Sequence, residues 1–166
     1  MILQIIGLKN SGKTTLMEHT IQVLKEHHHT VATVKHHGHH NSEDHHDITL
    51  QNNHVDHMKH FYAGADQSIV QGNAYQQSVT RTQNKTLDEI IDESVTIDSN
   101  VILVEGFKEA SYDKVLVYRD ENDRNALNHL THIKYAINIS KPEALRQYDQ
   151  WLLSFLYQRN ELNEAI

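Results

Sequence analysis

The sequence predicts an α/β fold in which a mostly parallel sheet is flanked by helices. Short β-branched apolar runs recur along the chain, and segments with a helical spacing of apolar residues lie between them. The first run leads into a glycine-rich loop that opens a helix. Strands that alternate with helices in this way are typical of parallel sheets with right-handed crossover connections.

Length and composition favour one packed domain over residues 1–166. Hydrophobic residues make up 38% of the 166 residues, and there is one proline. These values suit a folded chain with a single core. Cysteine is absent, which excludes a disulfide framework, a thiolate metal site and a cysteine nucleophile. No run approaches the roughly 18 apolar residues of a membrane span, and the apolar start is too short for a signal peptide. We therefore expect a cytoplasmic protein without membrane association.

The charge balance argues against general nucleic-acid binding. The formal net charge is −7 with histidine neutral, so the chain has no basic excess to neutralise a phosphate backbone. A local basic pocket is compatible with this balance.

The first half of the chain opens with a strand. Residues 2–6 form a nearly continuous apolar and mostly β-branched run, as in a strand buried on both faces of a parallel sheet. The glycines of residues 7–12 interrupt this run, and residues 14–26 have the apolar spacing of a helix. The further elements expected here are a strand over residues 31–36, a long His-rich loop over residues 37–53, a helix over residues 55–62, strands over residues 67–70 and 75–81, and a helix over residues 86–93.

The second half repeats the pattern. The expected strands cover residues 101–104, 114–118 and 133–139, and a helix covers residues 142–158. Ser140 and Glu143 have the spacing of a capping box at the start of this last helix.

The loop after the first strand carries the most specific motif. Residues 7–14, GLKNSGKT, fit G-x-x-x-x-G-K-[ST], in which backbone N–H groups and a helix N-terminus cradle phosphates. Lys13 would reach the β- and γ-phosphates, and the Thr14 hydroxyl would bind Mg²⁺. The motif makes the predicted fold P-loop NTPase-like. The candidate nucleotide-binding residues are Gly7, Lys9, Asn10, Ser11, Gly12, Lys13, Thr14 and Thr15, together with Lys35 and His36 at the end of the neighbouring strand.

A carboxylate follows the strand over residues 101–104. Glu105 would lie at the sheet edge where ligands of parallel sheets bind. It is therefore the candidate catalytic residue, which could orient the attacking water, and a candidate Mg²⁺ residue beside Thr14. Asp56 is a third candidate for the metal, although an acid at that position also suits the first turn of a helix.

Two further features have competing interpretations. Lys141 and Glu143 resemble a guanine-reading segment, but the capping box accounts for Ser140 and Glu143 without a ligand and is favoured. The histidines of the stretches His36-His37-Gly38-His39-His40 and His45-His46 could bind Zn²⁺ or Ni²⁺. Fixed geometry is needed for a true site, and we predict that the loop over residues 37–53 is mobile without ligand and is not a preformed metal site.

Four blocks together resemble the molybdopterin-guanine dinucleotide biosynthesis protein B (MobB) family. The blocks are the P-loop through Leu16, the V-K-H-H-G-H stretch within residues 31–39, residues 56–65, and the V-E-G-F-K stretch of residues 104–108. The resemblance implies a GTP-binding, weakly GTP-hydrolysing accessory protein of molybdenum cofactor biosynthesis. It also implies a homodimer that acts beside MobA, the enzyme that joins GMP to molybdopterin. The resemblance therefore implies GTP and Mg²⁺ as ligands.

Other functions remain open at this point. The histidines suggest a P-loop metallochaperone GTPase for nickel insertion, although its usual cysteine motif is impossible here. A small-molecule kinase would use the same P-loop, but the arginines are scattered. A nucleotide-switched binding protein with negligible turnover differs from the leading hypothesis only in hydrolysis rate.

Overall fold

The computed structural model describes residues 1–37 and 48–164. The chain divides into two compact units, one made of Met1–Gly38 with Ile91–Ile166 and the other of His39–Ile90. That residues 1–166 fold as one domain stays a prediction. Most of the predicted His-rich loop lies outside the described residues, and residues 48–53 contain no helix or strand.

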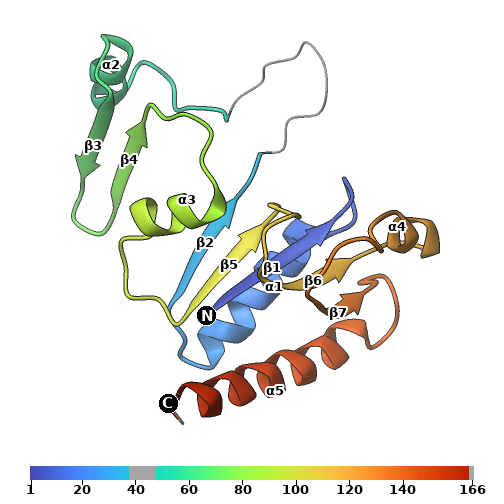
Figure 1. Cartoon of the computed structure of the whole chain (residues 1–166). Coiled ribbons are helices and arrows are strands. Elements are labelled where there is room, and N and C mark those ends of the chain that lie inside the picture. The colour runs from blue at the N-terminus through green and yellow to red at the C-terminus, as the bar shows by residue number, and fades with distance from the viewer. Residues whose placement is uncertain (38–47, 165–166) are drawn as a thin grey trace. The chain divides into compact units, whose positions relative to one another are not determined.

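The first unit contains a five-stranded sheet in the order β2-β5-β1-β6-β7 (Figure 1). Every pairing in this sheet is parallel, so the predicted P-loop NTPase-like, mostly parallel sheet is confirmed. The strands are β1 (Ile2–Gly7), β2 (Val31–Lys35), β5 (Val101–Glu105), β6 (Asp113–Val117) and β7 (Ile133–Ile137). The helices that lie wholly in this unit are α1 (Lys13–Glu26), α4 (Glu121–Ala126) and α5 (Ala144–Glu164).

The main core lies between one face of this sheet and the helices α1 and α5. Leu3 and Ile5 of β1 point to this face and are fully buried, as alternation along a strand requires. Leu24 of α1 and Leu152 of α5 pack into the same cluster. The Tyr148 hydroxyl lies 2.8 Å from Thr20 Oγ1, so the two helices are also joined by a buried hydrogen bond.

The opposite face of the sheet is covered differently. Ile6 and Leu116 pack there against Leu127 and Leu130, which follow α4. Residues 106–112, which connect β5 to β6, are all described and form no helix. This face therefore has a smaller apolar cluster and a crossover made of loop backbone.

The second unit contains α2 (Asp56–Tyr62) and a separate antiparallel pair, β3 (Gln67–Gln71) and β4 (Gln76–Thr80). Arg81 links them, because its guanidinium donates to the Phe61 and Ala65 carbonyls and lies 4.4 Å from the centre of the Phe61 ring. Helix α3 (Leu87–Ser94) begins in this unit. Its first turn has a capping box, in which Thr86 N–H donates to Glu89 Oε2 at 2.8 Å and Glu89 N–H donates to Thr86 Oγ1 at 3.3 Å.

The predicted capping box at Ser140 and Glu143 is wrong. The Ser140 N–H and hydroxyl both donate to Asn138 Oδ1, at 3.1 and 2.6 Å, so Ser140 closes a turn after β7. Glu143 has a positive φ of 62° and pairs with Arg146. Because a left-handed residue does not continue a helix, α5 begins at Ala144.

Helix α4 was not predicted from the sequence. Asp120 caps this short helix by accepting from the Asp123 N–H at 3.0 Å. The Asp123 carboxylate accepts in turn from the Arg119 side chain at 2.7 and 2.8 Å. This bidentate hydrogen bond lowers the pKa of Asp123.

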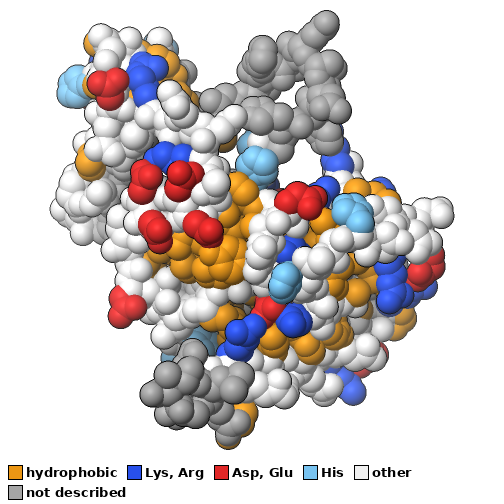
Figure 2. Space-filling model, viewed as in Figure 1, with side chains coloured by type: hydrophobic (Ala, Val, Ile, Leu, Met, Phe, Trp, Pro, Cys, Tyr) orange, Lys and Arg blue, Asp and Glu red, His pale blue; other side chains and the backbone are white. Residues whose placement is uncertain are grey.

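The surface carries charges of both signs. In the view of Figure 2, acidic side chains gather over α3, whereas basic side chains lie in several separate groups of the described residues, without a continuous basic stripe. Among the described helices, none combines the length and the apolar character that a bilayer crossing needs.

Replacing Leu152 by alanine tests the packing of α5 on the sheet. Leu152 is fully buried in the main core, whereas Tyr157 of the same helix is 65% exposed. We expect Leu152→Ala to lower the free energy of unfolding by about 2–5 kcal/mol, because it leaves a cavity. Urea denaturation measures this, and Tyr157→Ala, the control on the same helix, should change it by less than about 0.5 kcal/mol. Equal losses in the two variants would contradict the described packing.

Candidate functional site

The loop between β1 and α1 has the backbone that its motif requires. Gly12, directly before α1, has a φ of 98°, and Asn10 has a φ of 60°. Helix α1 has no side-chain hydrogen bond at its N-cap. Its first N–H groups and the positive end of its dipole are therefore open to an anion, as in phosphate-binding loops.

Close packing explains both motif glycines. A Cβ atom at Gly7 would lie 2.4 Å from the Val117 carbonyl oxygen and 2.5 Å from Ser11 Oγ. A Cβ atom at Gly12 would lie 2.4 Å from Ile139 Cδ1. The end of β6 and the segment that follows β7 therefore pack closely against the loop.

Ser11 offers a polar group to a ligand. Its residue is 3% exposed, and its hydroxyl has no hydrogen-bond partner within the described part of the chain. A buried polar atom is normally satisfied. The residues of this loop therefore fit an oxygen-rich ligand such as a phosphate group.

Lys13, Thr14 and Glu105 meet at this loop, as the sequence predicts. The Thr14 hydroxyl donates to Glu105 Oε2 at 3.4 Å. Lys35 Nζ lies 3.3 Å from Glu105 Oε1, which confirms that the end of β2 lies beside the same carboxylate. Lys13 Nζ donates to the Leu8 carbonyl at 2.7 Å.

The cluster has an excess of positive charge. Burial lowers the pKa of Lys13, the Glu105 carboxylate opposes that effect, and Lys108 and Lys35 lower the pKa further. Three ammonium groups thus act around one carboxylate. A polyanion such as a triphosphate would supply the missing negative charge.

His36 and the residues after β5 form the border of the cluster. The His36 N–H donates to the Glu105 carbonyl at 2.9 Å, and its ring stacks on Phe107 at 4.4 Å. Gly106 has a φ of 99°, and a Cβ atom there would lie 2.9 Å from His36 Cβ. Phe107 and Lys108 had no predicted role at the site, although both belong to the V-E-G-F-K stretch of residues 104–108.

The other predicted residues have simpler surroundings. Lys9, Asn10 and Thr15 are exposed on the loop and the first turn of α1. Asp56 belongs to the second unit, where its carboxylate accepts from Lys59 at 2.8 Å, and its role at a metal stays a prediction. No group of three or more His, Asp or Glu side chains suited to a metal occurs in residues 1–37 and 48–164. His39, His40, His45 and His46 lie outside this part.

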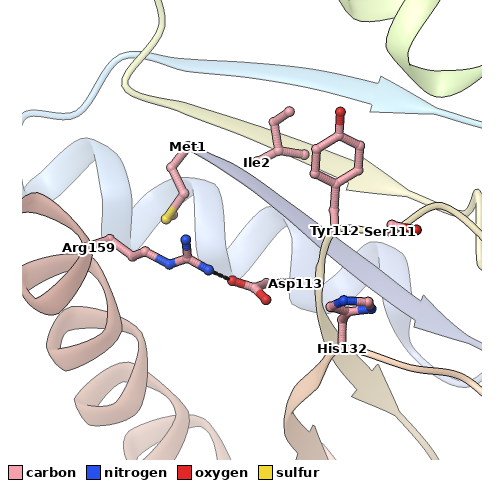
Figure 3. Close-up of a pocket in the computed structure, with 7 residues that line it drawn as sticks. All are labelled: Met1, Ile2, Ser111, Tyr112, Asp113, His132 and Arg159. Atoms are coloured by element: carbon pink, nitrogen blue, oxygen red, sulfur yellow. Dashed lines mark hydrogen bonds and ion pairs between the residues drawn. The ribbon is translucent and has the colours of Figure 1, made fainter. Parts of the chain in front are cut away.

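A separate cavity of about 480 Å³ lies at the opposite edge of the same sheet. Figure 3 shows Arg159 reaching from α5 toward Asp113 at the start of β6. Lys134 Nζ also lies 3.5 Å from the Asp113 carboxylate. The Asp113 carboxylate therefore already has two cationic partners. We interpret this cavity as the surroundings of an ion pair that joins α5 to the sheet. The residues that line it are Met1, Ile2, Ser111, Tyr112, Asp113, His132 and Arg159.

Solved structures share this fold. A MobB protein homolog from Bacillus stearothermophilus aligns with a TM-score of 0.71 at 27% identity, over 95% of this chain and 98% of that one. The MobB of Bacillus subtilis aligns with a TM-score of 0.63 at 27% identity, over 89% of this chain and 94% of that one.

Sequence comparisons agree with the structural ones. A protein of Bacillus subtilis (strain 168) named probable molybdopterin-guanine dinucleotide biosynthesis adapter protein is 32% identical over 147 residues, which are 89% of this chain and 80% of that protein. A molybdopterin-guanine dinucleotide biosynthesis adapter protein of Haemophilus influenzae is 31% identical over 121 residues, 72% of this chain and 64% of that protein. The family described as molybdopterin guanine dinucleotide synthesis protein B matches residues 2–139. The chain therefore belongs to the MobB family.

Proposed function

We propose that this protein is a GTP-binding adapter of molybdopterin guanine dinucleotide biosynthesis, with weak GTPase activity. The observation that carries the nucleotide site is the meeting of Lys13, Thr14 and Glu105 at a loop with phosphate-binding backbone. Membership of the MobB family and the names of its relatives support the pathway. A nickel metallochaperone has no comparable support among the described residues.

The P-loop would hold the triphosphate. The backbone of residues 8–12 and the N-terminus of α1 would bind the phosphate oxygens. On nucleotide binding, the Lys13 ammonium would give up its hydrogen bond to the Leu8 carbonyl and donate to a phosphate oxygen instead. The Leu8 carbonyl would still accept from the Ser11 N–H, at 3.3 Å, so this exchange would leave the loop hydrogen-bonded.

Thr14 and Glu105 fit a magnesium ion, because they offer a hydroxyl and a carboxylate oxygen 3.4 Å apart. Bound Mg²⁺ supplies charge neutralisation at the β- and γ-phosphates. Glu105 would also orient the attacking water, and the Lys35 ammonium lies beside its carboxylate, 3.3 Å from Oε1.

Guanine preference rests mainly on the family. The segment after β7 is in a suitable place, because Ile139 packs against Gly12 of the P-loop. Lys141 and Glu143 follow it and are exposed, so they are available to a base. MobA, molybdopterin and a second copy of the chain are the proposed partners.

Lys13→Ala tests the nucleotide site. The loss of a charge-assisted contact of about 1.5–3 kcal/mol should weaken GTP binding about 10- to 150-fold. Titration calorimetry with GTP and with ATP, each with and without Mg²⁺, measures this. Lys25→Ala removes the same charge from the last turn of α1 and should leave affinity unchanged. Equal GTP affinity in Lys13→Ala and wild type would refute the site, and equal GTP and ATP affinity in wild type would refute guanine preference.

Glu105→Gln separates hydrolysis from binding. The amide keeps the shape of the side chain but loses the negative charge that acts on the water and the metal. We expect kcat for GTP to fall about tenfold or more while Kd for GTP changes less. Single-turnover phosphate release and calorimetry measure the two quantities. Glu109→Gln, an exposed change in the same crossover loop, is the matched control. Unchanged turnover in Glu105→Gln would remove the catalytic role.

A further inference from the structure

A buried glutamine lies in the middle of the central strand. Gln4 of β1 is fully buried, and it pairs in register with Val104 of β5 and Lys114 of β6. Nothing in the proposed P-loop chemistry uses it. A fully buried amide needs a reason, because its polar atoms lose water on folding.

Both amide hydrogens of Gln4 are directed at the loop after Glu105. Gln4 Nε2 donates to the Gly106 carbonyl at 3.1 Å and to the Phe107 carbonyl at 2.8 Å. Carbonyl oxygens only accept, so these two partners fix which end of the amide faces them. Gln4 Oε1 is buried without a hydrogen-bond partner within the described part of the chain.

The two carbonyls belong to consecutive residues in an unusual conformation. Gly106 has a φ of 99° and Phe107 a φ of 50°. A left-handed conformation is easy for glycine but uncommon for phenylalanine, and it persists where surrounding contacts hold it. Gln4 provides such contacts from the neighbouring strand β1, and the stacking of Phe107 on His36 provides another. The Ala110 N–H also donates to the Phe107 carbonyl, at 2.9 Å.

We propose that Gln4 is a positioning residue, which holds the turn at Gly106 and Phe107 and thereby places Glu105 against Thr14 and Lys35. This proposal rests on the GTPase function proposed above. Glu105 is the last residue of β5, so the direction of its backbone depends on the turn that follows. Gly106 N–H donates to the Ile5 carbonyl at 3.4 Å, and the Gly106 carbonyl accepts from the Gln4 amide. Both backbone polar groups of Gly106 are therefore bonded to β1.

Lys114 provides a matched comparison. It is also buried on this face, and its Nζ donates to the Ala110 and Tyr112 carbonyls at 2.5 and 2.9 Å. It therefore fixes the far end of the same crossover. Lys114→Met removes a buried polar anchor of the loop, as Gln4→Met does, but leaves the turn next to Glu105 intact.

The experiment compares Gln4→Met and Lys114→Met with wild type in three measurements. We expect Gln4→Met to lower kcat for GTP about tenfold, equivalent to about 1.4 kcal/mol in the activation barrier, with Kd for GTP nearly unchanged. Its Gly106 amide should exchange with solvent faster than in wild type, by NMR. Lys114→Met should keep kcat and Gly106 exchange close to wild type, even where urea denaturation shows a similar loss of stability.

Several outcomes would overturn the proposal. An unchanged kcat in Gln4→Met, or equal falls in both variants at equal loss of stability, would show a structural role only. If the wild type binds GTP but does not hydrolyse it, the GTPase part of the proposed function fails. The positioning role is then tested by the exchange rate of the Gly106 amide alone, and an unchanged rate in Gln4→Met overturns it.

A measurement on the wild type covers the case in which Gln4→Met does not fold. The side-chain amide hydrogens of Gln4 should then exchange far more slowly than those of Gln150, which is exposed on α5. Equally fast exchange of the two side chains would overturn the proposal.

Discussion

The parallel pairing of β5 with both β1 and β2 is the constraint on which the candidate site depends. It sets Glu105 opposite Ile5 on one side and Lys35 on the other. Chain segments far apart in the sequence thereby bring a carboxylate, an ammonium group and the first turn of α1 together. A slip by one residue would move the Glu105 side chain to the other face of the sheet. Its contacts with Thr14 and Lys35 would then be lost together.

The charges of the site explain how a protein with a net charge of −7 can hold a triphosphate. Lys35, Lys108 and Glu105 all act on Lys13. Burial and the repulsion from Lys35 and Lys108 disfavour the charged form of Lys13, while Glu105 offsets part of that effect. An anionic ligand relieves the remainder. Local placement, and not the overall charge, thus decides which anions this chain can bind.

The sequence predicted the sheet, the P-loop and its meeting with Glu105, because buried β-branched strands and G-x-x-x-x-G-K-[ST] are strong local signals. It failed where a competing hydrogen-bond partner or a lack of apolar periodicity decides the local structure. Ser140 and Thr86 both have the Ser/Thr-x-x-Glu spacing just before a helix, and of these two Thr86 forms the capping box whereas Ser140 does not. Asn138 decides this, since its side chain takes the Ser140 hydrogen bonds. Helix α4 was missed because its six residues, ENDRNA, contain almost no apolar periodicity.

Gln4 shows why a polar residue in a buried strand carries information that hydrophobic patterning discards. In the hydropathy pattern Gln4 is only an interruption of an apolar run, because its hydrogen-bond partners lie more than 100 residues away along the chain. The two faces of β1 explain its presence. Leu3 and Ile5 face helices, which offer side chains and satisfy their own backbone groups. Gln4 faces a crossover loop, whose carbonyls need donors from elsewhere. Lys114, its register partner, meets the same need. Where a sheet face is covered by loop backbone in place of a helix, its buried positions must therefore include hydrogen-bond donors.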